Sequence, residues 1–198
     1  MMRLVPPSHV IPAQPVMALR PPSGADWVHE IKHDGYRLIV RRDGPTVRLL
    51  RLDREAAGDR GGCGAHQGQI DGEAVVLGPD GLSKFEELRR REAAQTAILY
   101  AFDLIEHDGE DLRDRRFLDR KAALARLLRD TDAGILLNEH VAEDGPTVFA
   151  HACRLGAEGI VSKRVDGTYR SGPCSAWIKV RNPASVALQR ERSENWNR

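Results

Sequence analysis

The stretch from residue 27 to residue 40 constrains the fold more than any other part of the sequence. Alternating apolar residues flank the dipeptide Asp34-Gly35 on both sides. Two such segments around Asp-Gly predict two β-strands joined by a tight turn. Lys32 ends the first predicted strand and Arg37 begins the second. A partly buried lysine beside a second cation loses its proton more easily and becomes a nucleophile. The alternative is a surface hairpin with charged residues near its turn.

The composition is that of a folded globular domain. The chain has 198 residues, of which 41% are hydrophobic and 30% charged, and its net charge is +1. This length suits one domain, and no apolar run approaches the roughly 20 residues of a membrane helix. Because the net charge is small, contact with nucleic acid would require a local basic patch. The three cysteines are widely spaced, which predicts a reducing cytoplasm without a disulfide framework or a zinc site.

The rest of the pattern predicts many strands and few helices. Further strands are expected at residues 47–52, 69–77, 98–105, 135–141, 159–163 and 177–180. Helices are expected at residues 84–95, 118–129 and 146–155. The first follows a capping-box pattern that starts at Ser83, and the third lies between Pro146 and Gly156. This mixture predicts an α+β fold with mainly antiparallel sheet.

We expect the chain to divide into three regions. Residues 1–26 are rich in proline and should run as an extended lead-in. Residues 27–183 should form the domain itself, interrupted by a flexible glycine-rich loop at residues 53–68. Residues 184–198 form a polar tail.

Charged residues interrupt the predicted strands where apolar residues would be expected. The cations are Lys32, Arg37, Lys163, Lys179 and Arg181, and the anions are Asp34, Glu73, Asp103 and Glu158. For each residue alone, a strand face that points toward water is the simpler explanation. Together, cations at strand ends suit a polyphosphate, and a few carboxylates suit Mg²⁺. Phe102 either offers a flat face to a nucleobase or belongs to the core.

Five short segments in order resemble the motifs of the covalent nucleotidyltransferases. More closely, they are similar to those of the ATP-dependent DNA ligase domain of bacterial non-homologous end-joining ligases. The segments are residues 30–37 (motif I), 71–76 (motif III), 100–104 (motif IIIa), 158–164 (motif IV) and 177–183 (motif V). The resemblance implies an ATP-grasp-like fold of mainly antiparallel sheets flanked by helices, with an ATP pocket between the sheets.

The resemblance also implies a role for each matched residue. Lys32 would attack the α-phosphate of ATP, form a lysyl-AMP intermediate and release pyrophosphate. Glu30 would lie by the adenine edge, and Phe102 would stack on its ring. Arg37 and Glu73 would hold the ribose, and Asp34 and Glu158 would help to place a Mg²⁺ or Mn²⁺ ion. Lys163 and Lys179 would contact the α-phosphate. Arg181 stands where the family often has a second lysine.

The chain departs from the family pattern in three places. Leu52 stands where the family has the arginine of motif Ia. Whether this chain contacts the phosphate backbone of a nick is therefore an open question. The residues after 183 are too few for the OB-fold domain that carries motif VI. We therefore expect that domain to be absent and adenylation to be slow or to need help in trans. A polymerase or nuclease domain is also expected to be absent.

The expected function is that of a minimal ATP-dependent DNA ligase. It would seal nicked or broken double-stranded DNA in repair and recombination, in the bacterial cytoplasm at the nucleoid. A Ku-type end-binding protein or a separate OB-fold protein is an expected partner, and a membrane is not. Two alternatives stay open. One is a degenerate, non-catalytic nucleotide- or DNA-binding remnant, and the other is an RNA ligase or capping-type nucleotidyltransferase.

Overall fold

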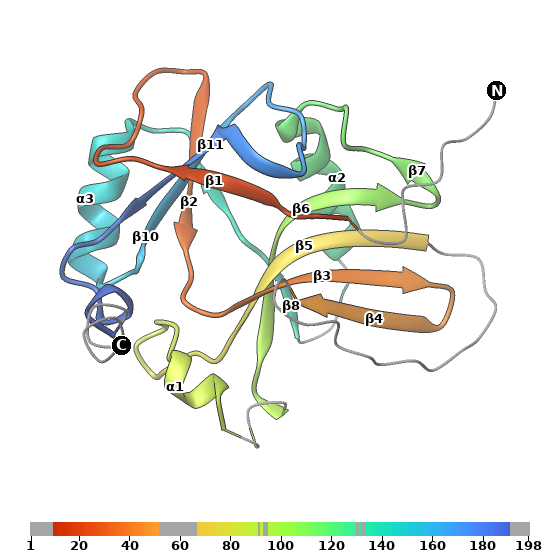
Figure 1. Ribbon diagram of the computed structural model, residues 1–198, viewed down its shortest axis with the longest axis horizontal. Helices are drawn as coiled ribbons and strands as arrows, with labels where there is room; N and C mark the ends of the chain where they lie inside the picture. The colour runs from red at the N-terminus through yellow and green to blue at the C-terminus, as the bar shows by residue number, and fades with distance from the viewer. Residues whose placement is uncertain are drawn as a thin grey trace.

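Two β-sheets pack against each other and form the body of the protein (Figure 1). The computed structural model describes residues 10–51, 67–90, 92, 95–129, 131 and 134–190. Sheet A has the order β1 (Ala13–Met17), β11 (Gly172–Arg181), β10 (Gly159–Arg164), β2 (Trp27–Lys32) and β9 (His140–Val141). Sheet B has the order β4 (Thr46–Arg51), β3 (Tyr36–Asp43), β5 (Gln67–Val75), β6 (Ile98–His107) and β7 (Glu110–Asp111), and β8 (Ile135–Leu137) also pairs with β6.

Most neighbouring strands in the described residues are antiparallel. The exceptions are the parallel pairs β1–β11 and β6–β8. The prediction of an α+β fold with mainly antiparallel sheet is therefore confirmed. The strands predicted around residues 27–52, 69–77, 98–105, 159–163 and 177–180 are present, with ends that differ by a few residues.

The turn between β2 and β3 carries the chain from one sheet to the other. β2 pairs with β10 and β9 in sheet A, whereas β3 pairs with β4 and β5 in sheet B. The two strands therefore do not form a surface hairpin. A Cβ atom on Gly35 would lie 2.1 Å from the carbonyl oxygen of Ala74. Only glycine allows the turn to pass this close to β5.

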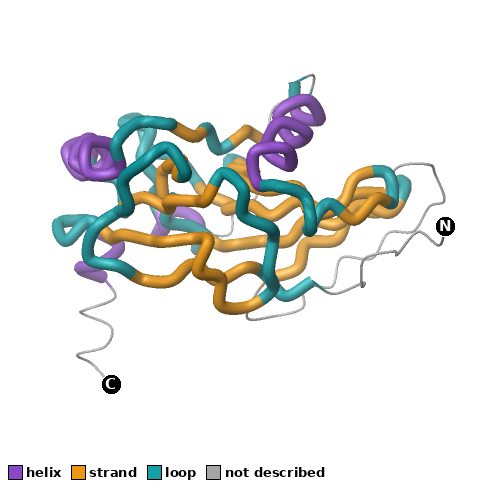
Figure 2. The backbone as a smooth tube through the Cα atoms, turned by 90° about the horizontal axis from the view of Figure 1, so that it is seen from above, coloured by secondary structure: helices purple, strands orange, loops and turns teal. Residues whose placement is uncertain are grey.

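The helices lie on the outside of the sheets (Figure 2). Helix α2 (Phe117–Leu128) packs on β6 and β8, and helix α3 (Gly145–Leu155) packs on β10 and β2. Asp144 caps the start of α3 by accepting a hydrogen bond from the Thr147 amide, and Gly156 ends it with a φ of 83°. Both helices were predicted. Between the sheets, the core contains buried residues from both, among them Ile39, Ile105 and Trp177.

Two predicted elements were wrong in extent. The helix expected at residues 84–95 is a single turn, α1 (Phe85–Leu88), with no side-chain cap. The capping box fails because the Ser83 hydroxyl lies 3.4 Å from the His33 ring instead of bonding the helix. The strand expected at residues 135–141 is divided into β8 and β9, which belong to different sheets. Asn138 separates them, and its side chain is drawn into a buried polar network.

Several predictions fall partly or wholly outside the described residues. They are the first nine residues of the lead-in, Leu52 at the motif Ia position, residues 53–66 of the glycine-rich loop, and residues 191–198 of the tail. The division at residues 26 and 183 stays a prediction, although β1 from the lead-in is an edge strand of sheet A. No helix in the described part of the chain is long and apolar enough to cross a membrane.

Candidate active site

Three neighbouring strands of sheet A present their side chains to one pocket. Residues directly opposite each other in antiparallel strands lie on the same face, and so do residues two apart. The pairing of β2, β10 and β11 therefore creates three rows on this face. The rows are Lys32, Gly159 and Arg181; Glu30, Val161 and Lys179; and Val28, Lys163 and Trp177. The first row is highly charged, and the third contains a large aromatic ring.

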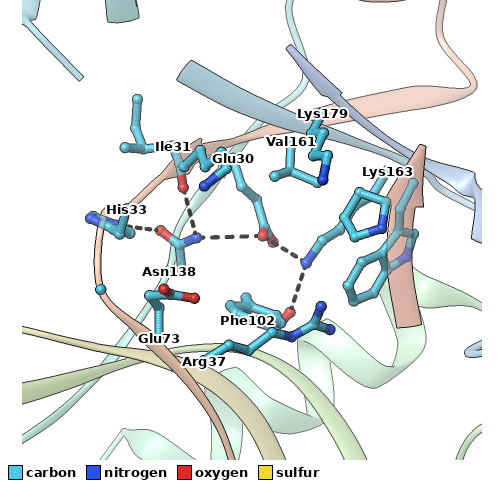
Figure 3. Close-up of a pocket in the computed structure, with 14 residues that line it drawn as sticks. Glu30, Ile31, His33, Arg37, Glu73, Phe102, Asn138, Val161, Lys163 and Lys179 are labelled. Atoms are coloured by element: carbon cyan, nitrogen blue, oxygen red, sulfur yellow. Dashed lines mark hydrogen bonds and ion pairs between the residues drawn. The ribbon is translucent and has the colours of Figure 1, made fainter. Parts of the chain in front are cut away.

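This face forms one wall of a cavity of about 280 Å³ (Figure 3). Sheet B supplies the opposite wall through Arg37, Glu73 and Phe102. Asn138, between β8 and β9, also lines the cavity. Phe102 and Trp177 lie at one end of the cavity, beside Lys163, Val161 belongs to the middle row, and Lys32 lies at the other end. The pocket thus combines flat apolar surfaces with a charged end, as a nucleotide requires.

Lys32 is held at the charged end by a carboxylate. Its Nζ lies 2.6 Å from Glu158 Oε2, and its side chain is 22% exposed. Burial raises the pKa of Glu158, although the positive charge of Lys32 opposes this. Arg181 approaches the same carboxylate, with its Nε 3.9 Å from Glu158 Oε1. Lys32 is therefore oriented in the cavity and is not a solvent-exposed lysine.

Arg37 and Glu73 form the sheet B side of the charged region. They lie opposite each other in the register of β3 and β5, but Arg37 binds Asp71 instead, with two hydrogen bonds of 3.0 and 2.6 Å. Arg37 also donates to the carbonyl of Ala13. Burial lowers the pKa of Arg37. The charge and the hydrogen bonds of the Asp71 carboxylate act in the opposite direction, and the net effect is a raised pKa. Burial raises the pKa of Glu73 to about 7, so this carboxyl group is partly protonated near neutral pH.

A β-bulge directs Phe102 into the pocket. Asp71 pairs with Asp103 and Gly72 pairs with Ala101, which leaves Phe102 as the extra residue of β6. A bulge of this kind changes the direction of a side chain relative to the regular strand. The Nζ atom of Lys163 lies 4.5 Å from the centre of the Phe102 ring and 4.2 Å from that of Trp177. Burial lowers the pKa of Lys163 to about 8.

Glu30 is the buried centre of a polar network beside the aromatic end. Its Oε1 accepts a hydrogen bond of 2.5 Å from Lys121, and its Oε2 lies 2.7 Å from Lys163 Nζ. Asn138 donates to Glu30 Oε2 at 3.5 Å and to the Ile31 carbonyl at 3.2 Å. The side chains of Glu30, Lys121 and Lys163 are at most 3% exposed. Because the charges are paired, this burial is tolerated.

A second, larger cavity of about 1010 Å³ also reaches Lys32. Its lining includes Asp34, Glu158 and Arg190. Both oxygens of Asp34 accept hydrogen bonds from Arg190, at 2.8 and 2.9 Å. Among the described residues, no group of three or more His, Cys, Asp or Glu side chains is arranged to hold a metal ion. Asp34 and Glu158, the two residues of the predicted metal site, both line this second cavity.

The structure brings most of the predicted site residues together. Those that line the first cavity are Glu30, Lys32, Arg37, Glu73, Phe102, Lys163 and Lys179. Glu158 and Arg181 adjoin Lys32 through the contacts above, and Asp34 lies in the second cavity. Lys163 lies in the same row as Trp177. Along the strands, this row is two positions from the row of Lys179 and four positions from the row of Lys32. Lys163 is therefore at the aromatic end, and its predicted contact with the α-phosphate stays a prediction.

Three buried residues of the site were not predicted. Asp71 binds Arg37 and accepts a 2.6 Å hydrogen bond from the Tyr169 hydroxyl. Lys121 and Asn138 hold Glu30. One signal was present in the sequence, because Lys121 occupies the same helix face as Phe117 and Leu124, which are buried. A charged residue among apolar residues at helical spacing indicates a buried partner.

Comparisons with known proteins agree with this geometry. The family described as "ATP dependent DNA ligase domain" matches residues 62–181. The multifunctional non-homologous end joining protein LigD of Pseudomonas aeruginosa is 37% identical over 187 residues, which is 88% of this chain and 22% of that protein. The LigD protein of Mycobacterium tuberculosis is 34% identical over 164 residues, 78% of this chain and 21% of that protein. The chain thus spans about a fifth of the length of these relatives.

Solved structures extend the comparison to the fold. A mycobacterial DNA ligase D complexed with ATP and MES superimposes with a TM-score of 0.74 and 30% identity, covering 87% of this chain and 60% of that one. The ligase domain of M. tuberculosis LigD gives a TM-score of 0.75 and 30% identity, with 87% and 59% covered. These matches confirm the predicted fold, and the family match covers more than half of the residues. The chain belongs to the family of ATP-dependent DNA ligase domains.

Proposed function

We propose that this domain transfers AMP from ATP to Lys32 and passes it on to a DNA 5′-phosphate during the sealing of DNA breaks. The observation that carries the proposal is the position of Lys32. Its amine lies 2.6 Å from Glu158 in a cavity that also contains Lys179 and Arg37. The aromatic end of the same cavity offers Phe102 to a base, with Val161 in the neighbouring row. A nucleotide with its base there would place its phosphates toward Lys32.

The proposed chemistry begins with attack by Lys32 Nζ on the α-phosphorus. A nitrogen–phosphorus bond forms, the bond to the bridging oxygen breaks, and pyrophosphate leaves with the electron pair. The ammonium proton must leave the amine, and the 2.6 Å hydrogen bond to Glu158 provides its path. Lys179 and Arg181 bring positive charge to this end of sheet A, which stabilises charge that develops on the phosphoryl group. The covalent intermediate stores the bond energy of ATP until DNA accepts the AMP.

A divalent cation fits the acidic residues of the charged end. The carboxylates of Asp34 and Glu158 each bind a cation, Arg190 and Lys32 respectively, and each has further acceptor positions that could hold a metal ion. One or two carboxylates plus phosphate oxygens form the preferred ligand set of Mg²⁺, and Mn²⁺ accepts the same donors. When bound, the ion would neutralise charge on the phosphates.

The names of the relatives support DNA as the acceptor and end joining as the process. We therefore propose nicked or broken double-stranded DNA as the substrate, in the bacterial cytoplasm at the nucleoid. A Ku-type protein or a separate OB-fold protein is a proposed partner. A non-catalytic, nucleotide-binding remnant is the second candidate, because Arg190 already holds the carboxylate of Asp34.

Labelling with α-labelled ATP and Mg²⁺ tests the proposal. The wild-type protein is expected to retain the label after denaturation, whereas Lys32→Ala should lose it completely. Lys84→Ala is the matched control, because the Lys84 side chain is 41% exposed, pairs with Asp80 and does not line the first cavity. Reversible ATP binding without a covalent label in the wild-type protein would favour the non-catalytic candidate. Chase of the labelled protein with nicked DNA or nicked RNA then separates DNA ligation from RNA ligation.

A further inference from the structure

We propose that Lys121 is a positioning residue that fixes the carboxylate of Glu30 and thereby makes the pocket select a 6-amino purine over a 6-oxo purine. The inference rests on the proposed function, because it assigns the base to the aromatic end of the cavity. Lys121 belongs to α2 and is not among the residues that line the cavity. Its effect on the nucleotide must therefore pass through the residues that it holds, and Glu30 is the one among them whose side chain accepts its hydrogen bond.

All three protons of the Lys121 ammonium group have acceptors within the protein. They are Glu30 Oε1 at 2.5 Å, the carbonyl oxygen of Asn138, and the carbonyl oxygen of Phe102 at 3.4 Å. An ammonium group has three donors and no acceptor. Lys121 is thus saturated and has no hydrogen bond to offer to a substrate. Its three partners come from β2, β6 and the connection between β8 and β9, so it ties both walls of the cavity to one helix.

The carboxylate of Glu30 retains capacity to accept one more hydrogen bond. An ionised carboxylate has about four acceptor positions, and three donors engage Glu30, namely Lys121, Lys163 and Asn138. The exocyclic amine of adenine is a donor, whereas the 6-oxygen of guanine is an acceptor. A fixed, ionised carboxylate accepts from the first and repels the second. Because Lys121 adds a charge-assisted bond on Oε1, it fixes the orientation of the Glu30 carboxylate.

Lys163 cannot replace Lys121 in this role. Its Nζ contacts Glu30 Oε2 and the Phe102 carbonyl at 3.3 Å, and it lines the cavity. Without Lys121, Oε1 would lose its strong donor, and Glu30 would rotate toward Lys163. The carboxylate would then be misplaced relative to the base, while Lys32 and its contact with Glu158 would be unaffected. We therefore expect a change in nucleotide affinity and base choice more than in the rate of the chemical step.

Single-turnover adenylation of Lys121→Met with ATP and GTP tests this inference. The loss of a hydrogen bond to a charged group predicts a KM for ATP about tenfold higher and an ATP-over-GTP preference about tenfold lower. The maximal rate at saturating ATP should change less than about threefold. Arg126→Met is the matched control, because Arg126 lies on the same helix with an exposed side chain, and it should behave as the wild type. A folded Lys121→Met protein with unchanged KM and preference would overturn the inference, and so would a loss of rate alone.

A second comparison covers the case in which Lys121→Met does not fold. The single variant Glu30→Gln is compared with the double variant Glu30→Gln/Lys121→Met. Both lack the Glu30 carboxylate that Lys121 binds in the wild-type protein. Both variants should have the same reduced preference for ATP, because there is no carboxylate left to position. A double variant with the wild-type preference would contradict the proposal. If the wild-type protein takes no label, the proposed function fails. The ATP-over-GTP preference is then measured by equilibrium binding. A reduced preference in Lys121→Met supports the role of Lys121, and an unchanged preference overturns it.

Discussion

Burial gives individual residues of this site properties that their side chains lack in water. Glu73 lies in β5, where it faces a cavity that also contains Lys32 and Arg37. The two cations favour its charged form, but loss of hydration is the larger effect and raises its pKa to about 7. The sequence alone showed a carboxylate beside cations, which would normally lower a pKa. The balance between these effects depends on how deeply the strand is covered.

The pKa of Glu73 predicts a stability that depends on pH. A glutamate in an unfolded chain has a pKa of about 4.3, so between that pH and about 7 the folded protein binds more protons at Glu73 than the unfolded chain. Stability therefore falls as the pH rises through this window. In the wild-type protein, ionisation of Glu73 should lower the free energy of unfolding by about 3 kcal/mol between pH 4.5 and 7.5, and Glu73→Gln should remove this decrease. Urea denaturation of both proteins at the two pH values measures it, and parallel pH profiles would contradict the assignment.

At the scale of elements, helix α2 is the support of the pocket. Its buried face contains Phe117, Arg120, Lys121 and Leu124. Arg120 binds both oxygens of Asp103 on β6 at 2.7 and 2.8 Å, and neither side chain is exposed. Phe102, the bulged residue of the pocket, precedes Asp103 directly. The position of Asp103 within an apolar strand is thus explained by a structural ion pair.

Replacement of Arg120 should destabilise the domain strongly. Arg120→Met leaves the Asp103 carboxylate buried without its partner, which costs about 3–5 kcal/mol. Arg120→Met/Asp103→Leu removes both charges and should recover part of that loss. Arg126→Met on the exposed face should remain within about 0.5 kcal/mol of the wild type. Equilibrium denaturation gives these values, and a cost below about 1 kcal/mol for Arg120→Met would show that the pair is not needed.

At the scale of the whole molecule, the site exists only because two sheets close around it. Lys32 and Lys179 come from sheet A, and Arg37, Glu73 and Phe102 come from sheet B. The core between the sheets also contains residues of both. A ligand that contacts both walls therefore stabilises the packing of one sheet on the other.

Nucleotide binding should accordingly raise the melting temperature of the domain. Lys32→Ala prevents the covalent step, and ATP at about 100 times its Kd should add about 2.7 kcal/mol. For a chain of this size, that corresponds to an increase in Tm of about 5–10 °C. Inorganic triphosphate is the matched ligand control, because it reaches only the charged end. Thermal melts measure both shifts, and equal shifts for ATP and triphosphate would argue against a base at Phe102.

The sequence by itself determined most of the strands, two of the three helices, and most of the side chains that line the first cavity. Local patterns suffice for these because alternation, turn residues and short motifs act over a few positions. Seven of the ten site residues that the resemblance to the ligase motifs implied line the first cavity.

Only the tertiary structure decided which charges pair with which. Arg37 binds Asp71 instead of the facing Glu73, Asp34 binds Arg190 across the fold, and Glu30 binds Lys121 from another element. These partners lie 34, 156 and 91 residues apart in the chain. Their choice depends on burial and distance after the sheets have packed, and no local pattern contains that information. Likewise, the bulge at Phe102 and the separation of β8 from β9 arise from contacts between strands.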